Sequence, residues 1–326
     1  MEIIILGSSA AIPVKERNLP SIALNYGSEI ILFDCGEDTQ RRFTQAGLKF
    51  NKLLRIFISH LHGDHIIGLP GLLFRFGLNE RMAPMDIIGP QNLYLYLFVH
   101  RKTIGLNPSY PVRVTEIDYE HKKLIIYKGL ESNQPSEEID LKDEIIFETK
   151  KYIVKYDLMS HSTPTLGYSF IEKPRYGKFN PERAKEIGIP MSGLWKKLQA
   201  GETIEFNGEI IDPEKEGIVG PKRPGRKITY SGDTGPCEAL IKLGMGSDVL
   251  IHESTFAQNL IDIAREKDHS TSVDAANAAK QMNAKQLILT HISSRYQEDA
   301  SKLLEEAREI FPNSILAEDL LKIELK

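Results

Sequence analysis

The chain has 326 residues, enough for one large domain or two modest ones with a sizeable core, and its composition is ordinary for a globular protein. No run approaches the roughly 18 apolar residues of a membrane span, and the short apolar stretch at the N-terminus is typical of a strand rather than a signal peptide. The net charge of −4 argues against a partner held by broad phosphate neutralisation. The two cysteines, Cys35 and Cys237, give no disulfide framework, so we expect a cytoplasmic protein without a membrane partner.

Strands alternate with helices in the first third of the chain. Strand-like runs occupy 2–6, 21–27, 29–36, 53–59 and 85–89, and helical patterns occupy 37–47, 66–78 and 90–106. This alternation favours stacked α/β layers. Further strand-like runs at 112–117, 124–127 and 144–159 have no convincing helix between them and suggest a more antiparallel region.

The second half repeats this alternation and places polar residues where strands end. Strand-like runs end in Asp233, in His252 with Glu253, and in His291, and helical segments at 271–282 and 297–311 lie between or after them. Folds of the α/β class place their sites at the carboxyl ends of strands, so these side chains are candidates for one common site.

Residues 172–226 break the pattern. This segment is rich in Pro, Gly and basic residues and has no long apolar run; from residue 171 to 226 it holds 11 Lys/Arg against 9 Asp/Glu, a net charge of +2. The rest of the chain therefore carries −6. The segment is either a solvated loop or an arm that grips a partner.

Four residues able to bind a metal, His60, His62, Asp64 and His65, fall within six positions of the stretch ISHLHGDHIIGLP. Four ligands from one tight loop are too many for a single zinc ion that keeps an open position, so two adjacent ions are the simplest solution. The missing ligands can come from other strand ends, where the candidates are His161, Asp233 and His291. A shared carboxylate would bridge ions roughly 3.5 Å apart, as in two-metal hydrolases.

Several motifs together resemble one family. The sequence HLHGDH matches the HxHxDH signature of the metallo-β-lactamase superfamily, and SGDT, HEST, HST and THISSRY together with the loop PVKERN resemble ribonuclease Z, short form. The resemblance covers essentially the whole chain. It implies an α/β fold, the metallo-β-lactamase αββα sandwich, with two mixed β-sheets flanked by helices and a protruding exosite arm. It also implies a single domain over 1–326 with an inserted flexible tRNA-binding arm at about 172–226.

The resemblance also assigns roles to the candidate residues. It implies that His60, His62 and His161 hold one zinc ion, that Asp64, His65 and His291 hold the second, and that Asp233 bridges them. Asp64 would also be the general base, and His269 would donate a proton to the leaving oxygen, oriented by Glu253. The implied cofactor is two Zn²⁺ per subunit, with Mn²⁺ or another divalent ion possible.

The implied activity is that of a zinc-dependent endoribonuclease that removes 3′ trailers from tRNA precursors. It would cut after the discriminator nucleotide and leave a 3′-hydroxyl on the tRNA and a 5′-phosphate on the trailer. The alternative within the superfamily is a phosphodiesterase acting on small phosphodiesters, and a third hypothesis is a zinc-stabilised RNA-binding scaffold without catalysis.

The expected substrate contacts lie outside the metal cluster: the basic residues Lys15, Arg17, Lys196, Lys197 and Arg295, and Gly193 in the arm. Lys15 and Arg17 belong to the PVKERN loop, which in the family accompanies cleavage after the discriminator. Leu194 stands where the family commonly has a proline, and Gly235 stands where an arginine is frequent. The family is commonly a homodimer, and the apolar surface of the helices at 66–78 and 90–106 is consistent with that.

Overall fold

The computed structural model describes residues 1–325, which divide into two compact units. The larger unit comprises residues 1–147, 154–170 and the chain from residue 228 onward, and the smaller unit comprises 148–153 and 171–227. The smaller unit contains the segment whose composition sets it apart in the sequence, together with residues 148–153.

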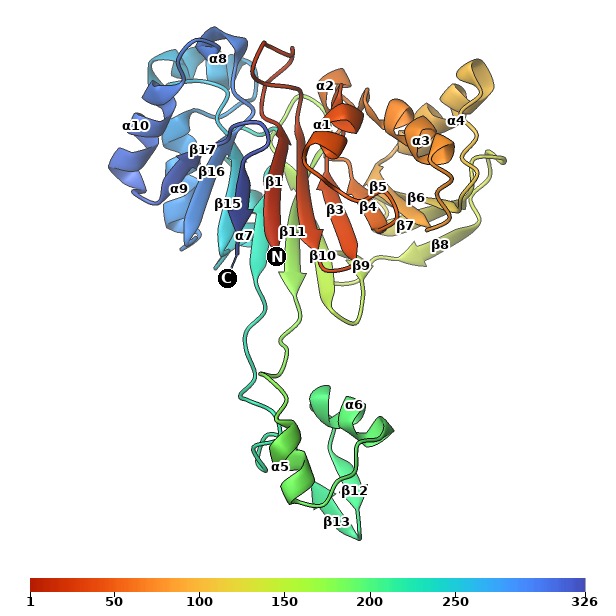
Figure 1. Ribbon diagram of the computed structural model, residues 1–326. Helices are drawn as coiled ribbons and strands as arrows, with labels where there is room; N and C mark the ends of the chain where they lie inside the picture. The colour runs from red at the N-terminus through yellow and green to blue at the C-terminus, as the bar shows by residue number, and fades with distance from the viewer. Residues whose placement is uncertain (326) are drawn as a thin grey trace. The chain divides into compact units, whose positions relative to one another are not determined.

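The strands follow one another in Figure 1 in the order β1 (Glu2–Gly7), β2 (Ser21–Tyr26), β3 (Glu29–Phe33), β4 (Leu53–Phe57), β5 (Met85–Pro90), β6 (Val112–Asp118), β7 (Lys123–Lys128), β8 (Glu137–Asp140), β9 (Ile145–Glu148), β10 (Tyr152–Met159), β11 (Thr165–Glu172), β12 (Ile204–Phe206), β13 (Glu209–Ile211), β14 (Lys227–Tyr230), β15 (Val249–Glu253), β16 (Gln286–Thr290), β17 (Ser314–Leu316) and β18 (Lys322–Glu324). The helices are α1 (Thr39–Gln45), α2 (Gly63–Ile66), α3 (Leu69–Leu78), α4 (Leu93–Ile104), α5 (Pro181–Glu186), α6 (Gly193–Gln199), α7 (Glu238–Gly244), α8 (Ile261–Glu266), α9 (Ser272–Gln281) and α10 (Ser301–Ile310). Short 3₁₀ turns lie at Gln258–Leu260 and Ser294–Tyr296.

Two mixed sheets form the centre of the larger unit. The first has the order β18-β1-β2-β3-β4-β5-β6-β7-β8, with parallel pairing from β3 to β6 and antiparallel pairing on either side. The second has the order β17-β16-β15-β14-β11-β10-β9, with parallel pairing from β14 to β17. The run at 144–159, expected as continuous strand, is divided into β9 and β10 by a turn that contains Lys150 and Lys151.

Helices cover the outer face of each sheet, as Figure 1 shows for α1, α3 and α4 on one side and α9 and α10 on the other. One core packs residues such as Phe43, Leu72 and Leu97 from these helices against Ile56 and Ile87 of the first sheet. A second core packs alanines of α9 against the strands of the other sheet. The larger unit is therefore an α/β sandwich of four layers, as expected.

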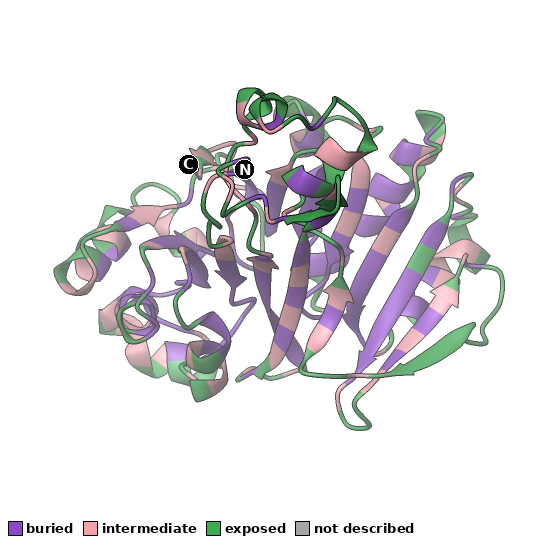
Figure 2. Cartoon of the chain, turned by 90° about the horizontal axis from the view of Figure 1, so that it is seen from below, coloured by how far each residue is buried: buried purple, intermediate pink, exposed green. Residues whose placement is uncertain are grey.

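An aromatic layer joins the two sheets. Phe33 of β3 stacks on Tyr168 of β11 and on Tyr230 of β14, with ring centroids 6.0 and 5.5 Å apart, and Phe57 of β4 meets Tyr168 edge-on at 5.5 Å. These side chains are buried, and the strands that carry them are mostly purple in Figure 2. Because each ring is fixed by partners on the facing sheet, the register between the sheets is fixed as well.

The smaller unit has a core of its own, formed by Ala184, Ile189, Leu198, Ile204, Ile211 and Ile218. Asn180 caps α5 by accepting a hydrogen bond from the Arg183 backbone N–H at 3.2 Å. A turn at Asn207 and Gly208, both with positive φ (52° and 83°), joins β12 to β13 as a tight hairpin. The segment is thus a folded unit and not a solvated loop, although its short apolar stretches gave no such signal.

Among residues 1–325, none of the helices is both long enough and apolar enough to cross a membrane.

Candidate metal centre

The polar strand ends of both sheets converge on one open cavity of about 520 Å³. Its lining includes His62, Asp64, His161, Asp233, His269 and His291. That volume lies within the usual range for ligand sites, and the convergence agrees with the rule that places α/β sites at strand ends.

The HLHGDH stretch leaves β4 as an extended segment and then turns into the short helix α2. His62 precedes α2 with extended dihedrals (φ −63°, ψ 146°), and Asp64 and His65 lie within the helix. This change of backbone direction separates His60 and His62 from Asp64 and His65. His60 and His65 are fully buried.

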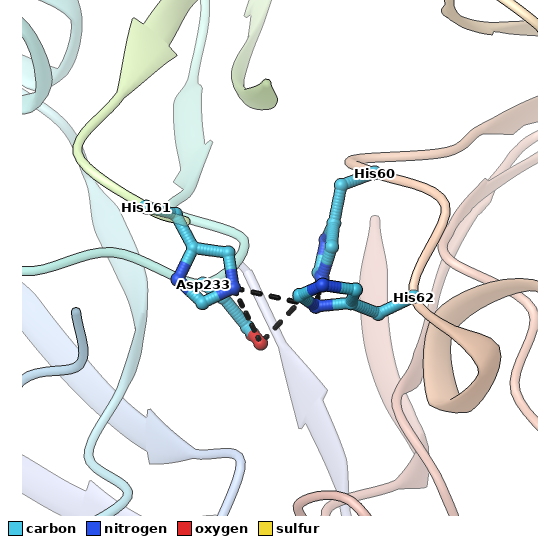
Figure 3. A group of neighbouring side chains, drawn as sticks. All are labelled: His60, His62, His161 and Asp233. Atoms are coloured by element: carbon cyan, nitrogen blue, oxygen red, sulfur yellow. Dashed lines mark hydrogen bonds and ion pairs between the residues drawn. The ribbon is translucent and has the colours of Figure 1, made fainter. Parts of the chain in front are cut away.

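Three overlapping groups of potential ligands result. His60, His62, His161 and Asp233 form the first, shown in Figure 3, and Asp64, His65 and His291 form the second. The third consists of Asp233 and His291 with His269, and the first two groups account for the seven candidate ligands. In the first group His60 Nε2 lies 3.0 Å from His62 Nδ1, and His161 Nε2 lies 3.4 Å from the same His62 atom. In the second, Asp64 Oδ2 lies 3.4 Å from His291 Nε2 and 3.6 Å from His65 Nε2.

Asp233 lies between the two groups. Its Oδ2 is 3.7 Å from His60 Nε2 and 4.0 Å from His161 Nε2, while its Oδ1 is 3.3 Å from His65 Nε2 and 3.4 Å from His291 Nε2. One carboxylate oxygen therefore faces each group, which is the geometry that a bridging carboxylate requires.

Four of the five histidines in these groups present Nε2 to the centre because a neighbour holds Nδ1. The Nδ1 atoms of His60, His65, His161 and His291 bond, in that order, to Ser59 Oγ (3.0 Å), Asp34 Oδ2 (2.7 Å), Asp268 O (3.0 Å) and Thr255 Oγ1 (2.9 Å). Such partners fix the tautomer and ring orientation of metal-binding histidines. Burial lowers the pKa of His60, which favours the neutral imidazole that a metal needs.

Two buried atoms in the cluster, His65 Nε2 and Asp233 Oδ1, have no hydrogen-bond partner. Leaving a buried nitrogen and a buried carboxylate oxygen unsatisfied is costly, and metal coordination is a common way of satisfying them. The histidine and aspartate donors in this cluster therefore fit divalent metal ions.

Asp34, at the end of β3, is a site residue that the sequence analysis missed. This fully buried carboxylate accepts hydrogen bonds through Oδ2 from His65 Nδ1 (2.7 Å), Ser59 Oγ (2.8 Å) and the Tyr230 hydroxyl (2.6 Å). Because Ser59 Oγ also bonds to His60 Nδ1, Asp34 orients one histidine of each ligand group. Its only signal in the sequence is a polar residue directly after an apolar strand.

Thr255 is the second residue that was missed. Its hydroxyl donates to Glu253 Oε2 at 2.7 Å and lies 2.9 Å from His291 Nδ1. It therefore links a metal-group histidine to the pair formed by Glu253 and His269.

Glu253 and His269 form a tight pair at the edge of the metal cluster. Glu253 Oε1 lies 2.7 Å from His269 Nδ1 and also accepts from the Thr234 backbone N–H at 2.9 Å. Burial opposes the charged imidazole, but the neighbouring Glu253 carboxylate raises the pKa of His269 to about 9. His269 therefore carries a proton at neutral pH, while Nδ1 is held and Nε2 is left for the cavity.

The residues expected to contact substrate lie in three different parts of the structure: the cavity, the PVKERN loop and the smaller unit. Arg295 lines the cavity with its guanidinium 5.4 Å from the centre of the Phe256 ring, and the Lys15 side chain is 93% exposed. Arg17 instead turns inward and donates to Ser8 Oγ and to the Ala317 carbonyl. The exposed residues Gly193, Lys196 and Lys197 lie on α6 in the smaller unit, where the Leu194 side chain packs on the core of that unit.

Two family models match parts of this chain, and curated proteins match its whole length. Residues 1–118 match a family described as "Anti-Pycsar protein Apyc1", and residues 217–292 match a "Beta-lactamase superfamily domain". Curated proteins named ribonuclease Z match along the whole chain. The protein of Methanosarcina mazei is 39% identical, covering 100% of this chain and 98% of its own, and that of Archaeoglobus fulgidus is 40% identical, covering 99% and 97%.

The chain belongs to the ribonuclease Z family.

Solved structures agree with this family membership. Human tRNase Z, short form, matches with a TM-score of 0.67 and 26% identity over 100% of both chains. The metallo-β-lactamase fold protein YhfI of Bacillus subtilis matches with a TM-score of 0.64 at 15% identity, over 99% of both chains. The four-layer sandwich is therefore the metallo-β-lactamase fold, as the sequence motifs implied.

Replacing Asp34 tests whether its hydrogen bonds to His65 and Ser59 organise the candidate metal ligands. In Asp34→Asn one acceptor oxygen becomes an N–H donor that faces the donors of His65, Ser59 and Tyr230. We expect affinity for divalent metal to fall by about 10- to 100-fold. Metal retained during dialysis against graded chelator measures this.

Tyr168→Phe is the matched control, because it removes a buried hydroxyl that bonds only to the Ile58 carbonyl. Equal metal retention in Asp34→Asn and the wild type would show that Asp34 does not organise the ligands.

Proposed function

We propose that this protein is an endoribonuclease that removes 3′ trailers from tRNA precursors. In this proposal it cuts after the discriminator nucleotide, leaving a 3′-hydroxyl on the tRNA and a 5′-phosphate on the trailer. The observation that carries the proposal is full-length similarity to ribonucleases Z, combined with the clustering of all seven candidate ligands beside one cavity, which five of them line.

We propose two Zn²⁺ ions per chain as the resident metals, with Mn²⁺ as an acceptable substitute. His60, His62 and His161 would hold one, Asp64, His65 and His291 the other, and Asp233 both. When bound, such ions supply positive charge to the phosphate oxygens and lower the pKa of an attacking water. Imidazole and carboxylate donors suit zinc, and the two oxygens of Asp233 face the two groups.

In the proposed mechanism, one side chain accepts a proton from the attacking water and another donates a proton to the leaving oxygen. Asp64 acts as general base toward the attacking water, since its Oδ2 is held between Ala11 N (2.9 Å) and His291 Nε2 (3.4 Å). His269 acts as general acid through Nε2 toward the leaving 3′-oxygen, and Glu253 holds Nδ1 and stabilises the protonated ring.

For the substrate, we propose that exposed basic residues bind tRNA phosphates. Arg295 is next to the cavity, and Lys15 is exposed in the PVKERN loop. The smaller unit would grip the tRNA with Lys196 and Lys197, which are exposed in α6, next to Gly193 at its start. An acidic protein needs such local patches to hold a polyanion.

We also propose that the protein acts as a homodimer in the cytoplasm. The exposed apolar residues Leu95, Val99 and Ile104 on α4, each about half accessible, offer a contact surface. A reducing compartment is consistent with Cys35 and Cys237, which are both free thiols.

Cleavage of a precursor tRNA tests the proposal. With zinc or manganese, the wild-type protein should release an intact trailer, and end mapping should place the cut after the discriminator with the stated end groups. His65→Ala removes a fully buried ligand and should abolish cleavage. A His65→Ala protein as active as the wild type would refute the site assignment.

Removing the smaller unit separates tRNA processing from small-diester hydrolysis. Because that unit has its own core, replacing Lys173–Arg223 by a short Gly/Ser linker should leave the larger unit folded. Precursor cleavage should fall at least about tenfold at physiological salt, since phosphate contacts are lost. Hydrolysis of bis(p-nitrophenyl) phosphate should persist.

The double variant Lys196→Glu with Lys197→Glu should leave the smaller unit folded. It should lower the rate of precursor tRNA cleavage as the deletion does. Unchanged tRNA affinity after the deletion would instead support an enzyme for small phosphodiesters.

Replacing His269, the proposed general acid, should slow the two reactions to different extents, because their leaving groups differ in whether they need a proton. His269→Ala should slow precursor cleavage by on the order of 100- to 10,000-fold, because a sugar 3′-oxygen needs a proton to leave. Hydrolysis of bis(p-nitrophenyl) phosphate should fall far less, because nitrophenolate leaves without protonation. The surface variant His121→Ala is the control, and equal losses on both substrates would exclude His269 as the general acid.

A further inference from the structure

The segment from Ser8 to Asn18, which contains the PVKERN loop, is closed at its base by hydrogen bonds. Ser9 N donates to the Asn18 carbonyl at 2.8 Å, and Val14 and Arg17 exchange backbone hydrogen bonds of 2.8 and 3.2 Å. The buried Asp319 carboxylate accepts from Ser8 Oγ (2.9 Å) and from Asn18 N (2.8 Å). The base of the segment is therefore tied to the C-terminal part of the chain.

Arg17 is part of this closure. Its Nη1 donates to Ser8 Oγ at 2.8 Å and also to the Ala317 carbonyl. Burial lowers the pKa of Arg17, and the nearby charges of Asp319 and Glu318 oppose that effect. Lys15, two residues earlier, is 93% exposed and makes only a 3.8 Å contact with Glu16. The two basic residues of one loop thus have different environments.

The other end of the segment reaches the metal cluster. Ala11 N donates to Asp64 Oδ2 at 2.9 Å, the same oxygen that lies 3.4 Å from His291 Nε2. Next to His291, Ile292 N donates to the Ser8 carbonyl (2.8 Å), and Ala10 N donates to the Ile292 carbonyl (3.0 Å). The segment therefore contacts the chain at Asp64 and at Ile292, the residue next to His291.

The backbone at Ala11 is strained, with a φ of 61° that non-glycine residues rarely adopt. Such a conformation persists only where the surrounding contacts impose it. Here those contacts are the Ala10 bond to Ile292 and the closure at Arg17, which together direct the Ala11 N–H at Asp64.

We propose that Arg17 is a positioning residue for Asp64, acting through the closed segment and not by contact with RNA. By holding the base shut, Arg17 keeps the Ala11 N–H on Asp64 Oδ2 and so fixes the direction of that carboxylate toward the second ligand group. The proposal rests on the proposed function, because it requires Asp64 to be a working group in that site.

The test uses a substrate too small to reach a tRNA-binding loop. For Arg17→Ala in the full chain, kcat on bis(p-nitrophenyl) phosphate should fall about 10- to 100-fold, and the weaker of two Zn²⁺ binding events should lose affinity by a similar factor. Isothermal titration with Zn²⁺ alone measures the second quantity. Glu16→Ala, a change in the same loop at a side chain that is 79% exposed, is the matched control and should equal the wild type in both measurements.

Direct RNA binding by Arg17 gives the opposite pattern. Arg17→Ala would then show wild-type diester hydrolysis and wild-type Zn²⁺ affinity, with a raised KM for precursor tRNA only, and that result would overturn the proposal. If Arg17→Ala does not fold, Ser8→Ala decides by the same two readouts, since it removes the hydroxyl shared by Arg17 and Asp319.

A wild-type protein that hydrolyses neither substrate would overturn the proposed function. In that case the Zn²⁺ affinities of the Arg17→Ala and Glu16→Ala proteins, compared with the wild type, decide the positioning role.

Discussion

The candidate metal centre depends on one buried carboxylate, Asp34. A fully buried negative charge is costly unless hydrogen bonds satisfy it, and Asp34 receives them from Ser59, His65 and Tyr230. The same bonds aim His65 directly and His60 through Ser59. The hydrogen bonds that satisfy the Asp34 carboxylate therefore also orient one histidine of each ligand group.

This constraint connects the centre to the core. Tyr230 donates to Asp34 from the second sheet while its ring stacks on Phe33 of the first. The aromatic layer that sets the register of the sheets also sets the distance between Asp34 and the strand ends opposite. Two residues of the centre, Asp34 and His291, also have positive φ (57° and 56°), a conformation that is uncommon for residues other than glycine.

Much of this architecture was predictable from short-range patterns. The helices near 66–78, 90–106, 271–282 and 297–311 and most of the strands were expected from periodicity, and the dense HLHGDH loop predicted a pair of ligand groups. Asp233 and His291 were candidates because polar residues that follow apolar strands of an α/β sheet meet at one edge.

What the sequence did not reveal depends on long-range geometry. Thr255 and Asp34 matter only because folding places them beside particular imidazole nitrogens, which no local pattern encodes. The hydrogen bond from the guanidinium of Arg17, a candidate substrate contact, to the Ala317 carbonyl joins residues 300 positions apart and could not be predicted from the sequence. The core of the smaller unit consists of single apolar residues from several short elements, so no periodic run of apolar residues predicts it.

We propose that these strand ends together hold two metal ions bridged by Asp233. Native mass spectrometry of the zinc-loaded protein measures this most directly. We predict two ions per chain in the wild type and loss of at least one in Asp233→Ala, with the fold retained. A single ion in the wild type, or an Asp233→Ala protein that still holds two, would contradict the account.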